Sequence, residues 1–124
     1  MKLRTGIAGF FLLAASQCWA QAGTDYSGVW DVQWQENNLQ LGAKLTIQGD
    51  TGTWQMFSQA RRNACFSMAA PIELKRVADN RATIALKYSA ALAGCADGMI
   101  HVGKLDGNTM TGKRGGVDMT FTRK

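Results

Sequence analysis

The sequence predicts an all-β protein, folded as a small antiparallel β-barrel of about seven to nine strands. Apolar and polar residues alternate with a period of two in several segments, as is typical of strands with one buried face. Residues that favour tight turns separate these segments at intervals of about ten residues. A closed barrel removes the exposed edges of a small sheet, so we favour a barrel over a sandwich.

The chain begins with a predicted secretory signal peptide, residues 1–22. Lys2 and Arg4 precede an apolar run over residues 7–15, and small residues suited to a signal peptidase follow it. The run is much shorter than the roughly twenty residues of a membrane-spanning helix. We therefore expect an exported protein with no membrane span.

Cleavage of the leader is expected after Ala20 or after Ala22. Either site leaves residues 23–124 as one domain, here a single β-barrel. Gln17, which is bulky and polar, precedes Cys18 and argues against lipid attachment at that cysteine. The short, alanine-rich leader is typical of bacteria, so we expect the protein in the periplasm or secreted.

The first alternating segment spans residues 29–35 and places Trp30 and Trp34 on one face. Four later segments follow the same rule, and one of them assigns Tyr88 to an inward face. These segments are 43–48, 72–75, 83–88 and 117–122. Turn signals lie between the strands at 37–38, 49–52, 79–80, 97–98, 106–108 and 115–116.

Two segments, 58–70 and 89–96, are rich in alanine and do not alternate, so we expect one or two short helical turns there. Each segment contains one of the two cysteines that remain after cleavage, Cys65 and Cys95. An even pair of cysteines in an oxidising compartment predicts a disulfide. That disulfide would join the two irregular connections and stabilise the domain by about 3–4 kcal/mol.

Charge and motifs exclude several classes of function. Loss of the leader lowers the formal net charge from +5 to +3, and the remaining basic residues form no stripe of the kind that binds nucleic acid. The single histidine, His101, lies opposite Ile100 and Val102 and fits a surface position better than a catalytic one. With Met99 nearby, a copper(I) site is an alternative to methionines in the core. We expect no enzyme, no cofactor and no bound metal.

Three tryptophans are the richest candidate site. Trp30 and Trp34 face the same way on one strand, and Trp54 falls on a predicted neighbouring strand. Buried indole N–H groups need hydrogen-bond partners, which a partly open, wet cavity would supply. The three rings therefore either fill the core or line a ligand site.

The opening Ser27-Gly28-Val29-Trp30 resembles the G-x-W start of lipocalin- and avidin-like barrels. The resemblance implies that a basic residue of the last strand, here Arg123, covers Trp30 by a cation–π contact. Size, leader, single disulfide and this opening also resemble the small periplasmic barrels that inhibit secreted metalloproteases. That family inserts its mature N-terminus into the protease, and the matching stretch here is residues 21–25.

The leading hypothesis is a monomeric binding or inhibitor-type module whose partner is a protein, such as a protease or another hydrolase. A second hypothesis is a carrier that holds a small apolar ligand between Trp30, Trp34 and Trp54, with Arg123 at the site. A third is an envelope stress or assembly factor that needs only a folded surface.

Overall fold

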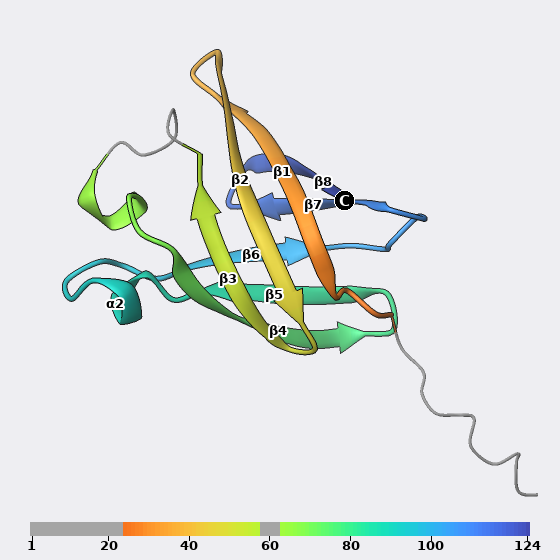
Figure 1. Ribbon diagram of the computed structural model, residues 1–124. Helices are drawn as coiled ribbons and strands as arrows, with labels where there is room; N and C mark the ends of the chain where they lie inside the picture. The colour runs from red at the N-terminus through yellow and green to blue at the C-terminus, as the bar shows by residue number, and fades with distance from the viewer. Residues whose placement is uncertain (1–23, 58–62) are drawn as a thin grey trace, which may run out of the picture.

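The computed structural model describes residues 24–57 and 63–124 and confirms the all-β fold. Eight antiparallel strands, neighbours in sequence order, close into one barrel (Figure 1). The strands are β1 (Gly28–Glu36), β2 (Leu39–Gln48), β3 (Thr51–Met56), β4 (Ala70–Ala78), β5 (Arg81–Leu86), β6 (Gly98–Val102), β7 (Thr109–Arg114) and β8 (Val117–Arg123). The barrel closes where β8 pairs with β1, from Trp30 opposite Arg123 to Trp34 opposite Met119.

The strands run between two ends of the barrel. At the end that we call the termini end lie Thr24, the C-terminus, the β2–β3 and β4–β5 hairpins and the β6–β7 loop (Figure 1). At the opposite end, which we call the disulfide end, lie the β1–β2 and β7–β8 hairpins and the two irregular connections. Every connection joins strands that are neighbours in the barrel, and four of them are tight hairpins: β1–β2, β2–β3, β4–β5 and β7–β8.

The β1–β2 hairpin shows how turn chemistry determines strand register. Asn37 and Asn38 form its two-residue turn, and both have a positive φ, 52° and 65°. Asparagine tolerates this left-handed conformation, which twists the turn in the sense that flanking strands require. The pairing then runs without interruption from Glu36 opposite Leu39 to Gly28 opposite Ile47.

The predicted alternation of strand faces is confirmed. Trp30, Val32 and Trp34 of β1 are all buried, and so are the predicted inward positions of the later segments, except Val117, which is partly buried. The prediction for Tyr88 was wrong in one respect: this residue is buried, but it begins the helix α2 (Tyr88–Ala91) and does not extend β5. The strand ends at Leu86, before the alanine-rich segment 89–96.

Both irregular connections contain a helical turn, as expected. The 3-10 turn η3 (Ala64–Phe66) begins after Asn63, whose side chain accepts a hydrogen bond from the Cys65 backbone N–H. The α2 turn is held by Asp97, which accepts a bond of 2.9 Å from the Ser89 backbone N–H.

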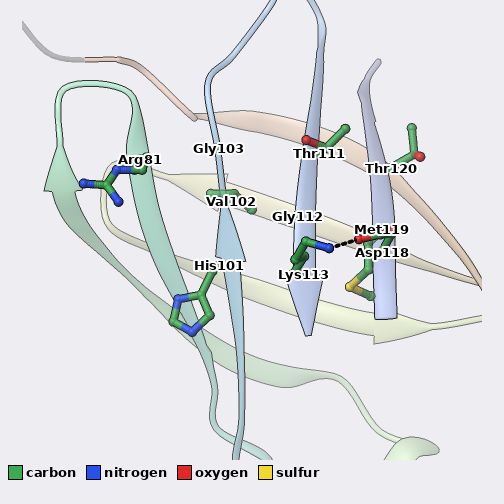
Figure 2. A pocket seen from close by; sticks show the side chains of 10 residues that line it. All are labelled: Arg81, His101, Val102, Gly103, Thr111, Gly112, Lys113, Asp118, Met119 and Thr120. Carbon is green, nitrogen blue, oxygen red and sulfur yellow. Dashed lines mark hydrogen bonds and ion pairs between the residues drawn. The ribbon is translucent and has the colours of Figure 1, made fainter. Parts of the chain in front are cut away.

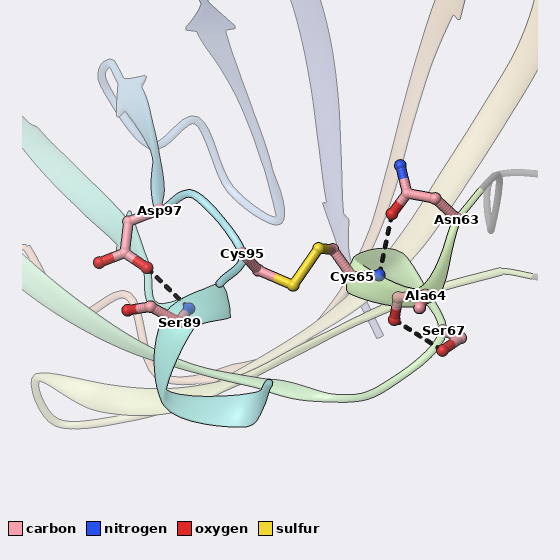
Figure 3. Close-up of a disulfide and its surroundings, with 7 residues drawn as sticks. All are labelled: Asn63, Ala64, Cys65, Ser67, Ser89, Cys95 and Asp97. Atoms are coloured by element: carbon pink, nitrogen blue, oxygen red, sulfur yellow. Dashed lines mark hydrogen bonds between the residues drawn. A yellow bond between two sulfur atoms is a disulfide. The ribbon is translucent and has the colours of Figure 1, made fainter. Parts of the chain in front are cut away.

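The predicted disulfide joins these two connections (Figure 3). The Cα atoms of Cys65 and Cys95 are 5.7 Å apart, and Cys95 is buried against the core. Beside the disulfide, the Phe66 ring packs on the Tyr88 ring with centroids 5.2 Å apart. The two connections therefore form one cap over the disulfide end. Across residues 24–57 and 63–124, no helix combines the length and apolar character needed to cross a bilayer.

Candidate functional site

The three tryptophans of the predicted site lie inside the barrel. Trp30 and Trp54 have no exposed area, and Trp34 is 4% exposed. The Trp34 and Trp54 rings stack with centroids 5.9 Å apart and planes 24° apart. The predicted placement of Trp54 on a neighbouring strand was wrong, because β2 separates β1 from β3 and the two rings meet across the interior.

Trp30 lies near the termini end and is covered by Arg123, the arrangement implied by the resemblance. The guanidinium carbon is 4.8 Å from the indole ring centroid. Arg123 also donates hydrogen bonds of 3.1 and 2.8 Å to the carbonyl oxygens of Asp25 and Ser27. The Trp30 Nε1–H donates to the Tyr26 carbonyl at 2.9 Å. The final strand thus fixes the start of the domain against the barrel.

The segment 24–27 continues across the termini end and places Tyr26 in the interior, with no exposed area. The Arg76 guanidinium lies 5.6 Å from the Tyr26 ring centroid and donates to the Thr24 carbonyl. Thr24 in turn donates from Oγ1 to the Asp79 carbonyl at 2.6 Å. Of the predicted protease-binding stretch 21–25, residues 21–23 lie outside the described residues, and the other two are bound to the barrel.

Tyr88 closes the disulfide end in a similar way. Its side chain is 2% exposed and lies under Phe66. Burial raises the pKa of Tyr88, against smaller opposing effects of the Arg114 charge and the Trp54 indole. Within the described part of the chain, the Tyr88 hydroxyl, the Trp54 Nε1 and the Tyr26 hydroxyl are buried without a hydrogen-bond partner. The interior is therefore occupied from both ends by the protein's own aromatic side chains.

The outer face of the barrel has a shallow basin of about 520 Å³ over β6, β7 and β8 (Figure 2). Gly103, Thr111 and Thr120 form its floor, which we call the basin floor. The Gly103 N–H donates a hydrogen bond of 3.0 Å to the Thr111 carbonyl oxygen, and Thr111 is paired with Thr120 on the next strand. These short side chains lie between longer ones, so the surface is hollowed there.

Charged and polar side chains surround the basin floor. Lys113 and Asp118 form an ion pair on one side. On the other side, His101 contacts the Thr83 hydroxyl through Nδ1 at 3.2 Å. The Arg81 side chain has no hydrogen bond or ion pair with any residue in 24–57 or 63–124. His101 is exposed, as the sequence predicted.

Sequence reasoning did not find this basin. The polar residues of each alternating segment identify the outward positions of a strand, but alternation does not reveal which strands are neighbours. Gly103 and Arg81 became part of one site only through the register that pairs Ala82 with Val102.

Comparisons with protein-family models, with curated proteins and with solved structures found no match to this chain. The functional interpretation therefore depends on the fold and on the geometry of these residues.

Proposed function

We propose that this protein is an exported binding module that contacts a protein partner through the outside of its barrel, as an inhibitor-type protein would. The observation that carries this proposal is the filled interior. Tyr26 and Tyr88 occupy the two ends, and Trp34 stacks on Trp54 between them. Small-molecule carriers typically keep a concave cavity of about 300–1,000 Å³ for the ligand.

Export is supported by two independent features. The leader resembles a secretory signal peptide, and the Cys65–Cys95 disulfide is of the kind that persists in oxidising compartments. The disulfide also stabilises a barrel of this small size, because it restricts the unfolded chain.

The way in which a hydrolase would be inhibited follows from the fixed segment 24–27. Thr24 and Asp25 are bound to the barrel through Arg76 and Arg123. If cleavage follows Ala20, three residues precede Thr24, and such a stretch reaches about 10 Å when extended. We therefore propose that the barrel surface contributes most of the contact and that the N-terminal arm contributes little.

An inhibition assay tests the proposal. The exported protein, with its disulfide formed, is mixed with a panel of secreted proteases and lysozymes, and each hydrolysis rate is measured. We expect one enzyme class to be inhibited with a 1:1 stoichiometry, and inhibition to survive removal of the residues before Thr24. Unchanged rates across the panel would contradict the inhibitor function.

The carrier hypothesis has one observation in its favour. The Trp54 Nε1–H and the Tyr88 hydroxyl are buried donors that make no hydrogen bond of normal geometry with residues 24–57 or 63–124, and a polar group of a small ligand could accept a bond from either. Native mass spectrometry of the protein purified from its producing cell tests this alternative. A molecule that co-purifies at 1:1 and is lost in Trp54→Phe would support a carrier, whereas the mass of the protein alone would not.

A further inference from the structure

The side chains that line the basin on β6–β8 are of the kind that binds an anionic group. Its donors are the Arg81 guanidinium and the hydroxyls of Thr111 and Thr120, and His101 donates from Nε2 in the tautomer in which Nδ1 accepts from Thr83. The carboxylate of the basin, Asp118, is already paired with Lys113. Among residues 24–57 and 63–124, a ligand would therefore meet donors without a partner and a carboxylate that is already paired.

The positions of these groups follow from the strand register. Arg81 is the first residue of β5 and precedes Ala82, so the strand register places it beside Gly103, and Thr111 lies one strand further on. Neighbouring strands are about 4.8 Å apart, so Arg81 and Thr111 are separated by about 10 Å across the glycine. A carboxylate placed over Gly103 would therefore lie between Arg81 and Thr111, within the roughly 520 Å³ of the basin.

An apolar side chain lies next to the basin on the same outer face. Met99 is two residues before His101 on β6, points outward like it, and is 50% exposed. Methionine adapts its shape to a partner and is favoured at binding surfaces. The β6–β7 register covers only His101–Lys113 and Val102–Gly112, so the part of β6 that carries Met99 lies beyond this pairing.

We propose that this surface binds an acidic peptide segment of the protein partner, in which a carboxylate enters the basin and a neighbouring apolar side chain contacts Met99. The inference rests on the proposed function and adds the location and the chemistry of the contact. Charge complementarity carries the choice of occupant, because Arg81 is the one charged side chain of the basin that has no ion pair with residues 24–57 or 63–124. A peptide supplies the apolar neighbour that a free anion lacks.

The test is a titration followed by two-dimensional 15N NMR of the exported, disulfide-bonded protein. The probe is the acetylated peptide Leu-Glu-Glu-Leu, and its matched control is Leu-Gln-Gln-Leu. We expect saturable shifts of the amides of His101, Gly103, Thr111 and Thr120 with the acidic peptide alone. Equal shifts with the glutamine peptide, or shifts spread over the whole barrel, would overturn the proposal.

Two variants with the same change in charge complete the test. Arg81→Glu should weaken binding of the acidic peptide by about tenfold or more, because it replaces the free donor with a carboxylate. Lys44→Glu, on β2 and outside the basin, should bind as the wild type does. Equal weakening by both variants would assign the effect to overall charge and reject the site. If the NMR spectrum shows that Arg81→Glu disturbs the fold, Arg81→Gln replaces it in the test, because glutamine keeps a neutral hydrogen-bond donor and removes the charge.

Two outcomes separate this inference from the proposed function. Peptide binding at the basin without inhibition of any hydrolase would retain the site and reject the inhibitor. Inhibition that Arg81→Glu leaves unchanged would retain the inhibitor and reject the site. A third titration uses a tetramer of galacturonic acid, which carries carboxylates on a sugar chain. If it binds the basin and the acidic peptide does not, the peptide assignment is wrong.

Discussion

Tyr26 and Tyr88 enter the barrel from opposite ends, one from the N-terminal segment and one from α2. Each contributes a large aromatic ring to the core, and each buries a hydroxyl that makes no hydrogen bond of normal geometry with residues 24–57 or 63–124. The ring stabilises the fold through burial, whereas an unsatisfied buried hydroxyl costs about 1–3 kcal/mol. In each tyrosine, the buried ring therefore stabilises the fold while the buried hydroxyl destabilises it.

Replacing each tyrosine with phenylalanine should remove the cost and keep the gain. We expect Tyr26→Phe and Tyr88→Phe to leave the free energy of unfolding unchanged or to raise it by about 1 kcal/mol. Urea unfolding at neutral pH, followed by tryptophan fluorescence, measures this. A loss of more than about 1 kcal/mol would mean that the hydroxyl has a partner in solution, such as an ordered water.

The same residues predict how stability depends on alkaline pH. Burial raises the pKa of Tyr26 and of Tyr88, so the folded state holds these phenol protons more tightly than the unfolded state does. Their contribution to stability is complete below about pH 10, the ordinary tyrosine pKa, and is lost as the pH rises above it. Wild type should lose more stability than the double phenylalanine variant between about pH 9 and pH 11. Parallel losses would contradict the buried, neutral state of the phenols.

Arg123 is the residue that joins the last strand to the first. It covers Trp30 and donates to the carbonyl oxygens of Asp25 and Ser27. Arg123→Ala should lower the free energy of unfolding by about 2 kcal/mol. Arg81→Ala, which removes an arginine without a partner among the described residues, is the matched control and should change it by less than about 0.5 kcal/mol. Thermal unfolding of both variants measures the two losses of stability. Equal losses would mean that Arg123 contributes only its charge.

At this scale the sequence predicted the contact of Arg123 with Trp30 only through the resemblance of the first strand. It did not predict Tyr26, because the segment before Gly28 has no alternation from which an inward direction could be derived. The burial of Tyr26 depends on Arg76 and on the β4–β5 hairpin, which are distant in sequence.

At the scale of elements, the cap over the disulfide end depends on one covalent bond between two short connections. The Cys65→Ser/Cys95→Ser variant opens a loop whose ends are 30 residues apart, so we expect a loss of about 3–4 kcal/mol. Urea unfolding of the variant and of wild type without reductant gives the difference. A difference near zero would mean that packing of Phe66 on Tyr88 holds the cap without the disulfide.

The β2–β3 hairpin contains the glycine that tolerates substitution least. A Cβ added at Gly52 would lie 1.8 Å from the Thr46 carbonyl oxygen of the paired strand, so the two strands would have to separate. Gly52→Ala should therefore cost about 3 kcal/mol or more. Gly116→Ala, in the β7–β8 turn, meets no atom within 4 Å and is the control. Equal thermal stability of the two variants would contradict the β2–β3 register.

The elements were predictable to the extent that local chemistry determines them. Alternation located the strands, and the asparagine pair located the first hairpin. Alternation also extended β5 too far, to Tyr88, because a buried residue at the start of a helical turn satisfies the same pattern as a strand. The pairing of the cysteines followed from their number, since only two remain after the leader.

At the scale of the whole molecule, a filled barrel offers its outer faces and its ends for binding. The sequence predicted closure of the sheet but could not decide between a packed core and an aromatic pocket, because both place indoles inward. The stacking of Trp34 on Trp54 across β2, and the tyrosines at the two ends, depend on contacts between distant segments. The basin of Arg81 and His101 depends on strand order in the same way.

The most direct test of a filled interior is a fluorescence titration with the neutral apolar probe N-phenyl-1-naphthylamine. Wild type should show no saturable binding of this three-ring probe, and Tyr88→Ala, which removes one ring at the disulfide end, should open a cavity that admits a molecule the size of benzene but not the probe. One-to-one binding by wild type, with quenching of the tryptophans, would contradict the account. In that case the interior, and not the outer face, would be the binding site.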